Sequence, residues 1–221
     1  MSFTFFTDRL GGYSQGDFSS LNLALHVDDD PSLVIQNREV ISDQFGPTMY
    51  MNQVHGNVVE VVTNANQSTP TCDALVTTFP GITLAVMTAD CIPLLLSSEN
   101  VVAAVHVGRR GLVNGVARIT VEKMRELGAG AITGTLGPSI CGTCYEVDQN
   151  TFDEVISMFP SARSKTAQGT PALDLAKALV ADLNDVSIDC QIDPRCTNED
   201  PDLFSYRKSQ RTGRQAGLIR L

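Results

Sequence analysis

Residues 82–111 read ITLAVMTADCIPLLLSSENVVAAVHVGRRG, and this stretch decides the fold. It holds the most apolar part of the chain, with runs of strand length bounded by Asp90-Cys91 and by a turn near Glu99-Asn100. Short apolar runs between such breaks are typical of buried β-strands. We therefore expect two or three buried strands, over Leu84–Met87, Pro93–Ser97 and Val101–His106.

Outside this stretch, helical and strand-like segments are mixed without strict alternation. Asp30-Pro31 is a helix-start signal and Gly46-Pro47 a stop signal, which predicts a helix over 31–45. Further helices are expected over 112–127 and near 149–159 and 172–184, and strands within 49–62 and over 131–136 and 217–221. Neither a dinucleotide-binding G-x-G-x-x-G nor a P-loop motif occurs. The pattern predicts an α+β fold, with mixed β-sheets covered by helices, in a single domain over residues 1–221.

The composition is that of an ordinary globular enzyme-sized chain. Of 221 residues, 43 % are hydrophobic and 19 % charged, and the net charge is −9. An acidic chain is a poor candidate for binding nucleic acid or acidic membranes. We see no signal-peptide pattern and no apolar run of about 18 residues, so we expect a cytoplasmic protein without a membrane partner.

Basic residues gather near the end of this acidic chain. After Asp202 there are no acidic residues, while five basic ones follow: Arg207, Lys208, Arg211, Arg214 and Arg220. We interpret them mainly as a solvated or subunit-contacting segment. A phosphate or other anion site is the alternative, because arginine offers bidentate geometry to such groups.

Six cysteines occur in a chain without an export signal, and we interpret them as reduced thiols or metal ligands. Cys141 and Cys144 have the C-x-x-C spacing of a redox pair or of half a zinc site. A redox pair needs a thioredoxin-like context and a Cys₄ zinc site needs a second C-x-x-C, and neither is present in the sequence. We therefore expect a structural or incidental role for this pair.

Three residues at the edges of apolar segments point to chemistry. His55 precedes a glycine, Cys91 lies where two apolar runs are interrupted, and His106 ends the third run. Two imidazoles and one thiolate would make a three-ligand zinc site with an open fourth position. Alternatively, Cys91 is a nucleophile with His55 or His106 as its base, or all three are structural.

Charged neighbours supply candidate partners for this site. Asp73 and Asp90 could orient a histidine or transfer protons, although each could equally be a turn or cap residue. Arg110 is a candidate anion clamp, and Arg38 lies in the first expected helix. His26 is a further histidine, for which we favour a loop or packing role.

Eleven short motifs, in this order along the chain, resemble the laccase-domain (YfiH-like) family. They are Ser20-Leu21-Asn22-Leu23, Asn37-Arg38, Asn52-Gln53-Val54-His55-Gly56, Asp73-Ala74-Leu75-Val76-Thr77, Thr88-Ala89-Asp90-Cys91, Ala104-Val105-His106, Arg110-Gly111, Leu136-Gly137-Pro138-Ser139-Ile140, Cys144-Tyr145-Glu146-Val147, Phe204-Ser205-Tyr206-Arg207 and Gly213-Arg214-Gln215-Ala216. Each is weak alone, but together they cover the chain from about Phe5 to Leu221. The resemblance implies an α+β fold similar to that of certain Cys-His hydrolases.

The resemblance also implies an activity and a cofactor. The family holds zinc by two histidines and one cysteine, which match His55, Cys91 and His106. Its implied reaction is purine nucleoside phosphorolysis, with adenosine deamination and methylthioadenosine phosphorolysis alongside, so the expected partners are purine nucleosides and phosphate. We expect a monomer or weak homo-oligomer.

Roles follow for the remaining candidates under this reading. Asp73 or Asp90 would move protons, Arg38 and Arg110 would neutralise phosphate, and Asn22 and Gln53 would contact the substrate. The usual family tryptophan in H-A-G-W-R-G is Arg109 here, which exchanges a flat aromatic for a cation.

Two other functions stay open at this point, and a third is disfavoured. A Cys-His amidase that edits peptidoglycan precursors by removing misincorporated serine would use Cys91 as a nucleophile. A non-catalytic metal-binding module would hold the ion without turnover. A multicopper oxidase is disfavoured, because such sites use many histidines and the chain has three.

Overall fold

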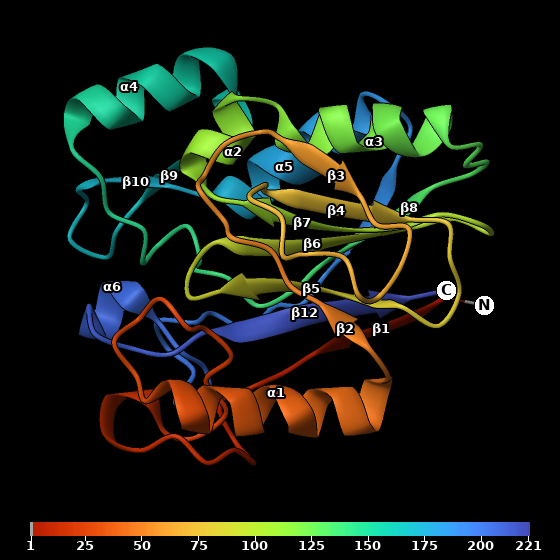
Figure 1. The fold of residues 1–221 in the computed structure, drawn as a ribbon. Helices are drawn as coiled ribbons and strands as arrows, with labels where there is room; N and C mark the ends of the chain where they lie inside the picture. Colours follow the sequence, from red (N-terminus) through yellow and green to blue (C-terminus); the bar gives the residue numbers. More distant parts are fainter. Residues whose placement is uncertain (1) are drawn as a thin grey trace.

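Two β-sheets lie face to face at the centre of the protein, and helices cover their outer faces (Figure 1). The computed structural model describes residues 2–221. One sheet has six strands in the order β11-β8-β6-β7-β4-β3, and the other has four in the order β1-β12-β5-β2. Parallel and antiparallel pairs occur in both sheets, so the structure confirms the predicted mixed-sheet α+β fold in one domain.

The strands have the following bounds. The six-stranded sheet contains β3 (Val59–Val61), β4 (Ala74–Thr77), β6 (Ile92–Ser97), β7 (Val102–Val107), β8 (Thr133–Leu136) and β11 (Asp189–Ile192). The four-stranded sheet contains β1 (Phe3–Phe6), β2 (Thr48–Met49), β5 (Thr83–Thr88) and β12 (Gln215–Arg220). A separate hairpin pairs β9 (Arg163–Lys165) with β10 (Pro171–Leu173).

The helices lie on opposite outer faces. On the four-stranded sheet lies α1 (Pro31–Phe45), whose Ile41 and Phe45 pack against β5 and β12. The other face is covered by α2 (Arg109–Val113), α3 (Val116–Glu126), α4 (Gln149–Met158) and α5 (Leu175–Asn184). Short turns are the 3₁₀-helices η1 (Gly16–Phe18) and η2 (Pro160–Ala162) and the four-residue α6 (Tyr206–Ser209). No helix within residues 2–221 combines the length and the apolarity needed to cross a membrane.

Alternation along the central strands divides their side chains between separate cores. Leu94 and Leu96 of β6 point to the helix-covered core, whereas Leu95 points to the core between the sheets. Because side chains alternate along a strand, a strand buried on both faces is apolar throughout. This explains the unbroken apolar runs of residues 82–107. It also places His106 on the same face of β7 as Ala104, which faces the core between the sheets.

The expected elements are found, with differences at two helices. The helix expected over 112–127 begins earlier, at Arg109, and is divided in two at Asn114-Gly115, where Gly115 has a φ of 73°. The helix expected from 172 begins at Leu175, because Asp174 caps its first turn and residues 171–173 form β10. The strands β1, β9, β10 and β11 are not among the predicted elements; all four are short, and β1, β9 and β11 carry exposed side chains.

Candidate metal centre and pocket

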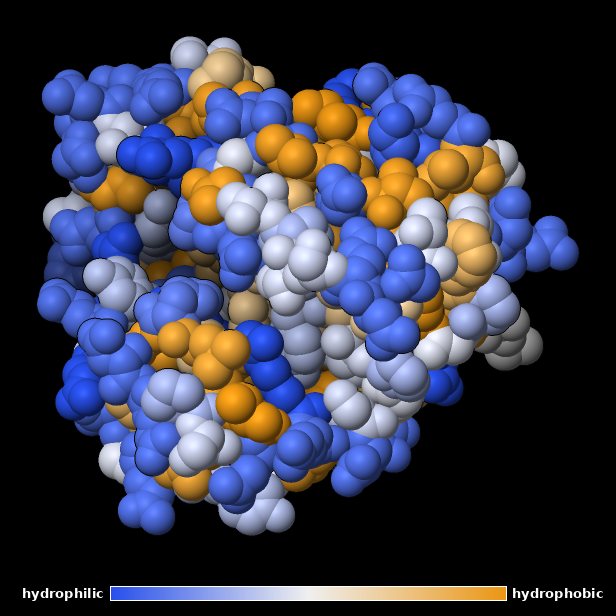
Figure 2. Space-filling view, viewed as in Figure 1, coloured by the Kyte–Doolittle hydropathy of each residue, from blue (hydrophilic) through white to orange (hydrophobic). Residues whose placement is uncertain are grey.

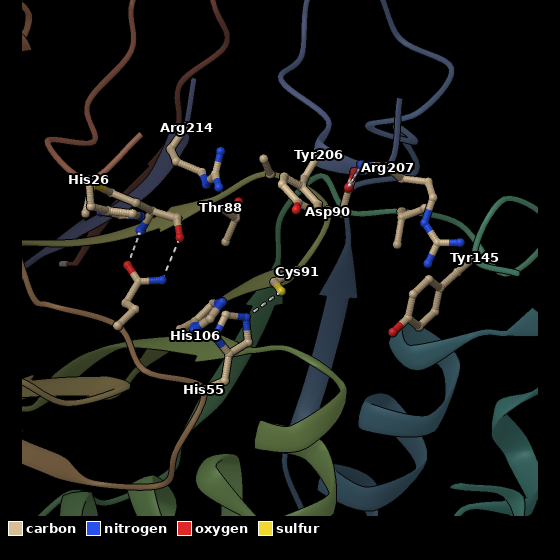
Figure 3. Close-up of a pocket in the computed structure, with 14 residues that line it drawn as sticks. His26, His55, Thr88, Asp90, Cys91, His106, Tyr145, Tyr206, Arg207 and Arg214 are labelled. Carbon is tan, nitrogen blue, oxygen red and sulfur yellow. Dashed lines mark hydrogen bonds between the residues drawn. The ribbon is translucent and has the colours of Figure 1, made fainter. Parts of the chain in front are cut away.

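A pocket of about 360 Å³ opens at one edge of the stacked sheets, where the strands β5, β6 and β7 begin or end. Figure 2 shows the molecule hollowed at this edge. Cys91 lies in the turn between β5 and β6, His106 lies near the end of β7, and His55 comes from the loop after β2. Figure 3 shows these three side chains together on one wall of the pocket.

The three side chains converge closely enough to share one ion. The nitrogen and sulfur donor atoms of His55, Cys91 and His106 all lie within 4.8 Å of one another. Cys91 Sγ is 3.8 Å from His55 Nε2, and the two imidazole rings meet edge to face at 4.7 Å. The structure thus brings the sequence-predicted trio together.

Asp73 organises both histidines from beneath the pocket. Its carboxylate is fully buried and lies 2.8 Å from His106 Nδ1. It also accepts hydrogen bonds from the backbone N–H groups of His55 at 2.9 Å and Gly56 at 2.7 Å. A carboxylate bonded to Nδ1–H leaves Nε2 free, the arrangement found behind many metal-binding histidines. Asp73 is therefore placed to orient ligands rather than to contact substrate.

The backbone at the site is strained at two residues and approaches the trio closely at a third. His55 and Asp90 both have positive φ, 59° and 92°, which non-glycine residues adopt at an energetic cost. Gly108 lies directly against the trio, since a Cβ on it would be 3.0 Å from both Cys91 Sγ and His55 Cδ2. A side chain at position 108 would therefore occupy the space between the side chains of Cys91 and His55.

The charges of the trio favour an ionised sulfur. Burial by itself would raise the pKa of the Cys91 thiol, but the charge of His106 and hydrogen bonds with both histidines lower this pKa to about 6. Burial would likewise lower the pKa of His106, but the neighbouring Cys91 and Asp73 raise it to about 9. These contacts therefore favour the thiolate form of Cys91, which is the form that binds metals and attacks carbonyl groups.

Asp90 holds the opposite wall of the pocket in place. Its carboxylate accepts hydrogen bonds from Thr197 Oγ1 at 2.7 Å, Ser205 Oγ at 2.6 Å and the backbone N–H of Arg207 at 2.6 Å. Its backbone oxygen accepts from the N–H of Ile140 at 3.0 Å. With both carboxylate oxygens bonded in this way, the structure shows Asp90 as an anchor for the loops, and its predicted proton-transfer role stays a prediction.

The anchored wall contributes cations and aromatic rings that are not among the site residues predicted from the sequence. Arg207 lies over the Tyr145 ring at 5.0 Å, and Arg214 lies 5.9 Å from the Tyr206 ring centre. Both arginines belong to the basic segment, so the anion-site alternative for that segment points to this wall (Figure 3). His26 also lines the pocket, and burial together with the charges of Arg214 and Arg38 lowers its pKa.

The four predicted substrate contacts lie in different places. Gln53 lines the pocket, but its side-chain amide is bonded at both ends to the backbone of Met87. Arg110 lines a smaller adjoining pocket of about 310 Å³, which shares Cys91 and His55 with the larger one.

The other two predicted contacts are outside the lining of both pockets. Asn22 is fully buried and bonded within its loop to Ala24 and Asp29, and to the N–H of Arg214. Arg38 donates to the carbonyl of Leu23 and lies 4.0 Å over the Tyr50 ring. Their buried hydrogen bonds make both residues supports of the pocket wall that carries Arg214 and Met87.

Comparison with known proteins shows the family to which this mixed α+β domain belongs. Residues 3–221 match the model of a family described as multi-copper polyphenol oxidoreductase laccase, and the chain belongs to this family. The family is the one suggested by the sequence motifs.

Curated relatives carry a different description from the family's own. A purine nucleoside phosphorylase of Corynebacterium glutamicum is 42 % identical over 226 residues, covering 97 % of this chain and 92 % of that protein. One from Streptomyces coelicolor is 44 % identical, with 97 % and 93 % covered. The purine nucleoside phosphorylase YlmD of Bacillus subtilis is 32 % identical, with 97 % and 86 % covered.

Solved structures show the same fold. A Neisseria meningitidis protein superposes with a TM-score of 0.91 at 37 % identity, covering 100 % of this chain and 94 % of that one. YlmD from Geobacillus stearothermophilus gives a TM-score of 0.84 at 30 % identity, covering 99 % and 91 %.

Proposed function

We propose that this protein is a zinc-dependent purine nucleoside phosphorylase. The observation that carries the proposal is the His55, Cys91 and His106 cluster, which lies between two adjoining pockets lined by arginines. Relatives with this name, at about the same length, support an enzyme that acts on purine nucleosides.

The residues present fit a zinc ion. Two imidazoles and one thiolate are ligands that zinc accepts, and three protein ligands leave one position open. Gly108 leaves room at the donor atoms, and Asp73 fixes which nitrogen of His106 faces them. A bound zinc would supply a Lewis acid at the floor of the pocket. A multicopper oxidase does not fit, because the whole chain has three histidines.

The two pockets suggest how the reactants are held. The larger pocket, with His26, Thr88 and Tyr206 in its lining, would take the nucleoside. Thr88 Oγ1 is buried there without a hydrogen-bond partner among residues 2–221, and a polar atom of the substrate would satisfy it. The smaller pocket, with Arg109 and Arg110, would bind phosphate by charge-assisted hydrogen bonds.

In the proposed reaction a phosphate oxygen attacks the anomeric carbon of the ribose. The bond from that carbon to the purine nitrogen breaks, the purine leaves with a proton, and ribose 1-phosphate forms. Holding both reactants in adjoining pockets reduces the entropy cost of their encounter. Adenosine deamination, in which water replaces the 6-amino group and ammonia leaves, and methylthioadenosine phosphorolysis are the further activities that we propose for the same site.

The test uses the purified zinc-loaded protein with adenosine, inosine or methylthioadenosine, with and without phosphate. We expect phosphate-dependent release of adenine or hypoxanthine in a chromatographic assay, together with ribose 1-phosphate or, from methylthioadenosine, 5-methylthioribose 1-phosphate. Cys91→Ser and His106→Ala should each abolish release, while Cys190→Ser should retain it, because Cys190 lies outside both pockets. If the loaded protein releases no purine base from any of the three nucleosides in a phosphate-dependent way, the phosphorylase is refuted.

The ionised thiolate of Cys91 beside two histidines favours a second candidate, a Cys-His amidase acting on peptidoglycan precursors. This enzyme would keep its activity after a chelator removes the metal and would form an acyl-thioester at Cys91. A zinc-dependent reaction without an acylated Cys91 in mass spectra would exclude it.

A further inference from the structure

Two tight turns from distant parts of the chain lie against each other beside the pocket. The first, Cys141–Cys144, follows β8; the carbonyl of Cys141 accepts from the N–H of Cys144 at 3.0 Å. The second, Cys196–Glu199, precedes α6; the carbonyl of Cys196 accepts from the N–H of Glu199 at 3.1 Å. Each turn brings the side chains of its first and fourth residues together.

The two turns are held to each other by backbone hydrogen bonds. Ser139 and Cys196 form a parallel bridge, and the N–H of Thr197 donates to the carbonyl of Ser139 at 3.1 Å. The N–H of Cys141 points at Cys196 Sγ, 3.3 Å away. The backbone therefore fixes the relative position of the four side chains.

These side chains place three sulfur atoms and one carboxylate oxygen in one cluster. The donor atoms of Cys141, Cys144, Cys196 and Glu199 all lie within 4.8 Å of one another. Cys144 Sγ and Glu199 Oε1 are 3.6 Å apart. In a tetrahedral site with zinc–sulfur bonds of about 2.3 Å, neighbouring sulfurs are about 3.8 Å apart, so a contraction of about 1 Å at most would complete it.

We propose that Cys141, Cys144, Cys196 and Glu199 form a second metal site, which binds zinc or another thiophilic divalent cation. Four protein ligands close the coordination sphere, which is the property of a structural site rather than a catalytic one. In the sequence this C-x-x-C has no second such pair, which is why a structural or incidental role was expected for it. The fold supplies a C-x-x-E pair, with a carboxylate in place of the fourth thiolate.

The cluster lies where a bound ion would stabilise the wall of the larger pocket. The first turn leads into Tyr145 and the second leads towards Tyr206 and Arg207, and all three residues line the larger pocket. The Arg207 guanidinium donates to the carbonyl of Glu146 at 2.7 Å, so the two segments meet again at the pocket wall. An ion that joins the turns would keep this wall closed around the substrate, without contacting the His55, Cys91 and His106 cluster.

Zinc content measured by mass spectrometry, after loading with zinc chloride and removal of the excess, tests the proposal. We expect two zinc ions per wild-type chain, one in Cys196→Ser and one in His55→Ala, and none in the double variant. Cys190→Ser is the matched control and should keep two, because Cys190 belongs to neither cluster. Since His55→Ala removes the other ion, the two sites are counted separately whether or not the proposed phosphorylase activity is found.

Cobalt supplies a second measurement that does not depend on activity. Cobalt(II) bound to three thiolates gives a stronger near-ultraviolet charge-transfer band than cobalt bound to one. The strong band should persist in His55→Ala and in Glu199→Gln. In Glu199→Gln, competition with a metal-binding dye should show that the second site binds the metal at least ten-fold more weakly. A wild type with one zinc ion and no change in Cys196→Ser would overturn the proposal, as would a disulfide among Cys141, Cys144 and Cys196 in protein prepared without oxidant.

Discussion

The exchange of Asp73 for asparagine tests the organisation of the proposed metal centre most directly. The two carboxylate oxygens accept hydrogen bonds from four groups. Oδ1 accepts from the backbone N–H of His55 and from the ring Nδ1–H of His106. Oδ2 accepts from the backbone N–H groups of Gly56 and Val54. Asparagine keeps one oxygen, so its NH₂ group faces two donors on the other side. Each stranded buried donor costs about 1–2 kcal/mol, so we expect Asp73→Asn to lower the free energy of unfolding by about 2–4 kcal/mol.

The same change should weaken metal binding, because the ring of His106 loses the group that orients it. Loss of such a partner reduces metal affinity about 10–100-fold. Urea unfolding measures the first effect, and competition with a chromophoric chelator measures the second. Asp148→Asn is the matched control: Asp148 caps α4, where asparagine serves equally well, and neither quantity should change appreciably. If Asp73→Asn binds zinc as tightly as the wild type, Asp73 does not orient the ligands.

Three other changes probe separate parts of the structure. Gly108→Ala should weaken zinc binding at least several-fold in the chelator assay, because the added Cβ would press on two ligands. Gly130→Ala is the control and should leave zinc affinity unchanged, because the space around Gly130 is open. Equal zinc affinities of the two variants would contradict the close packing at Gly108. Arg110→Met should raise the KM for phosphate about ten-fold or more, with a smaller effect on the KM for the nucleoside. An equal rise in both KM values would contradict the assignment of phosphate to the smaller pocket. Burial raises the pKa of Cys72 to about 12 and that of Cys190 to about 11, so thiolate appears there only at high pH. Alkylation of these two thiols at pH 9 should therefore be far slower in the folded than in the urea-unfolded protein, and equal rates would contradict the burial.

The sequence predicts the central strands and the trio for the same physical reason. Apolar runs buried on both faces are visible without knowledge of their partners, and polar residues at their ends stand out against them. His106 and Cys91 were recognisable in this way, and Asp73 was recognisable as a candidate for orienting a histidine. The structure adds the 2.8 Å contact that joins Asp73 to His106.

The opposite wall of the pocket could not be predicted, because long-range hydrogen bonds form it. Arg207 and Tyr206 reach the site since Asp90 binds a segment more than a hundred residues later in the chain. Local patterns describe that segment only as basic, which also suits an exposed surface. The contact between Cys144 and Glu199 could not be predicted for the same reason, since a single glutamate near a cysteine carries no signal of its own.

The position of β12 has a consequence for how the protein folds. This strand lies between β1 and β5, with Arg220 opposite Phe3 and Gln215 opposite Thr88. The four-stranded sheet therefore joins residues from both ends of the chain, and a high mean sequence separation between contacting residues slows folding. Until β12 pairs, β5 leaves an edge of its backbone unsatisfied next to the residues that form the pocket, an arrangement prone to aggregation. During synthesis, the pocket could therefore assemble only after the residues of β12 have left the ribosome.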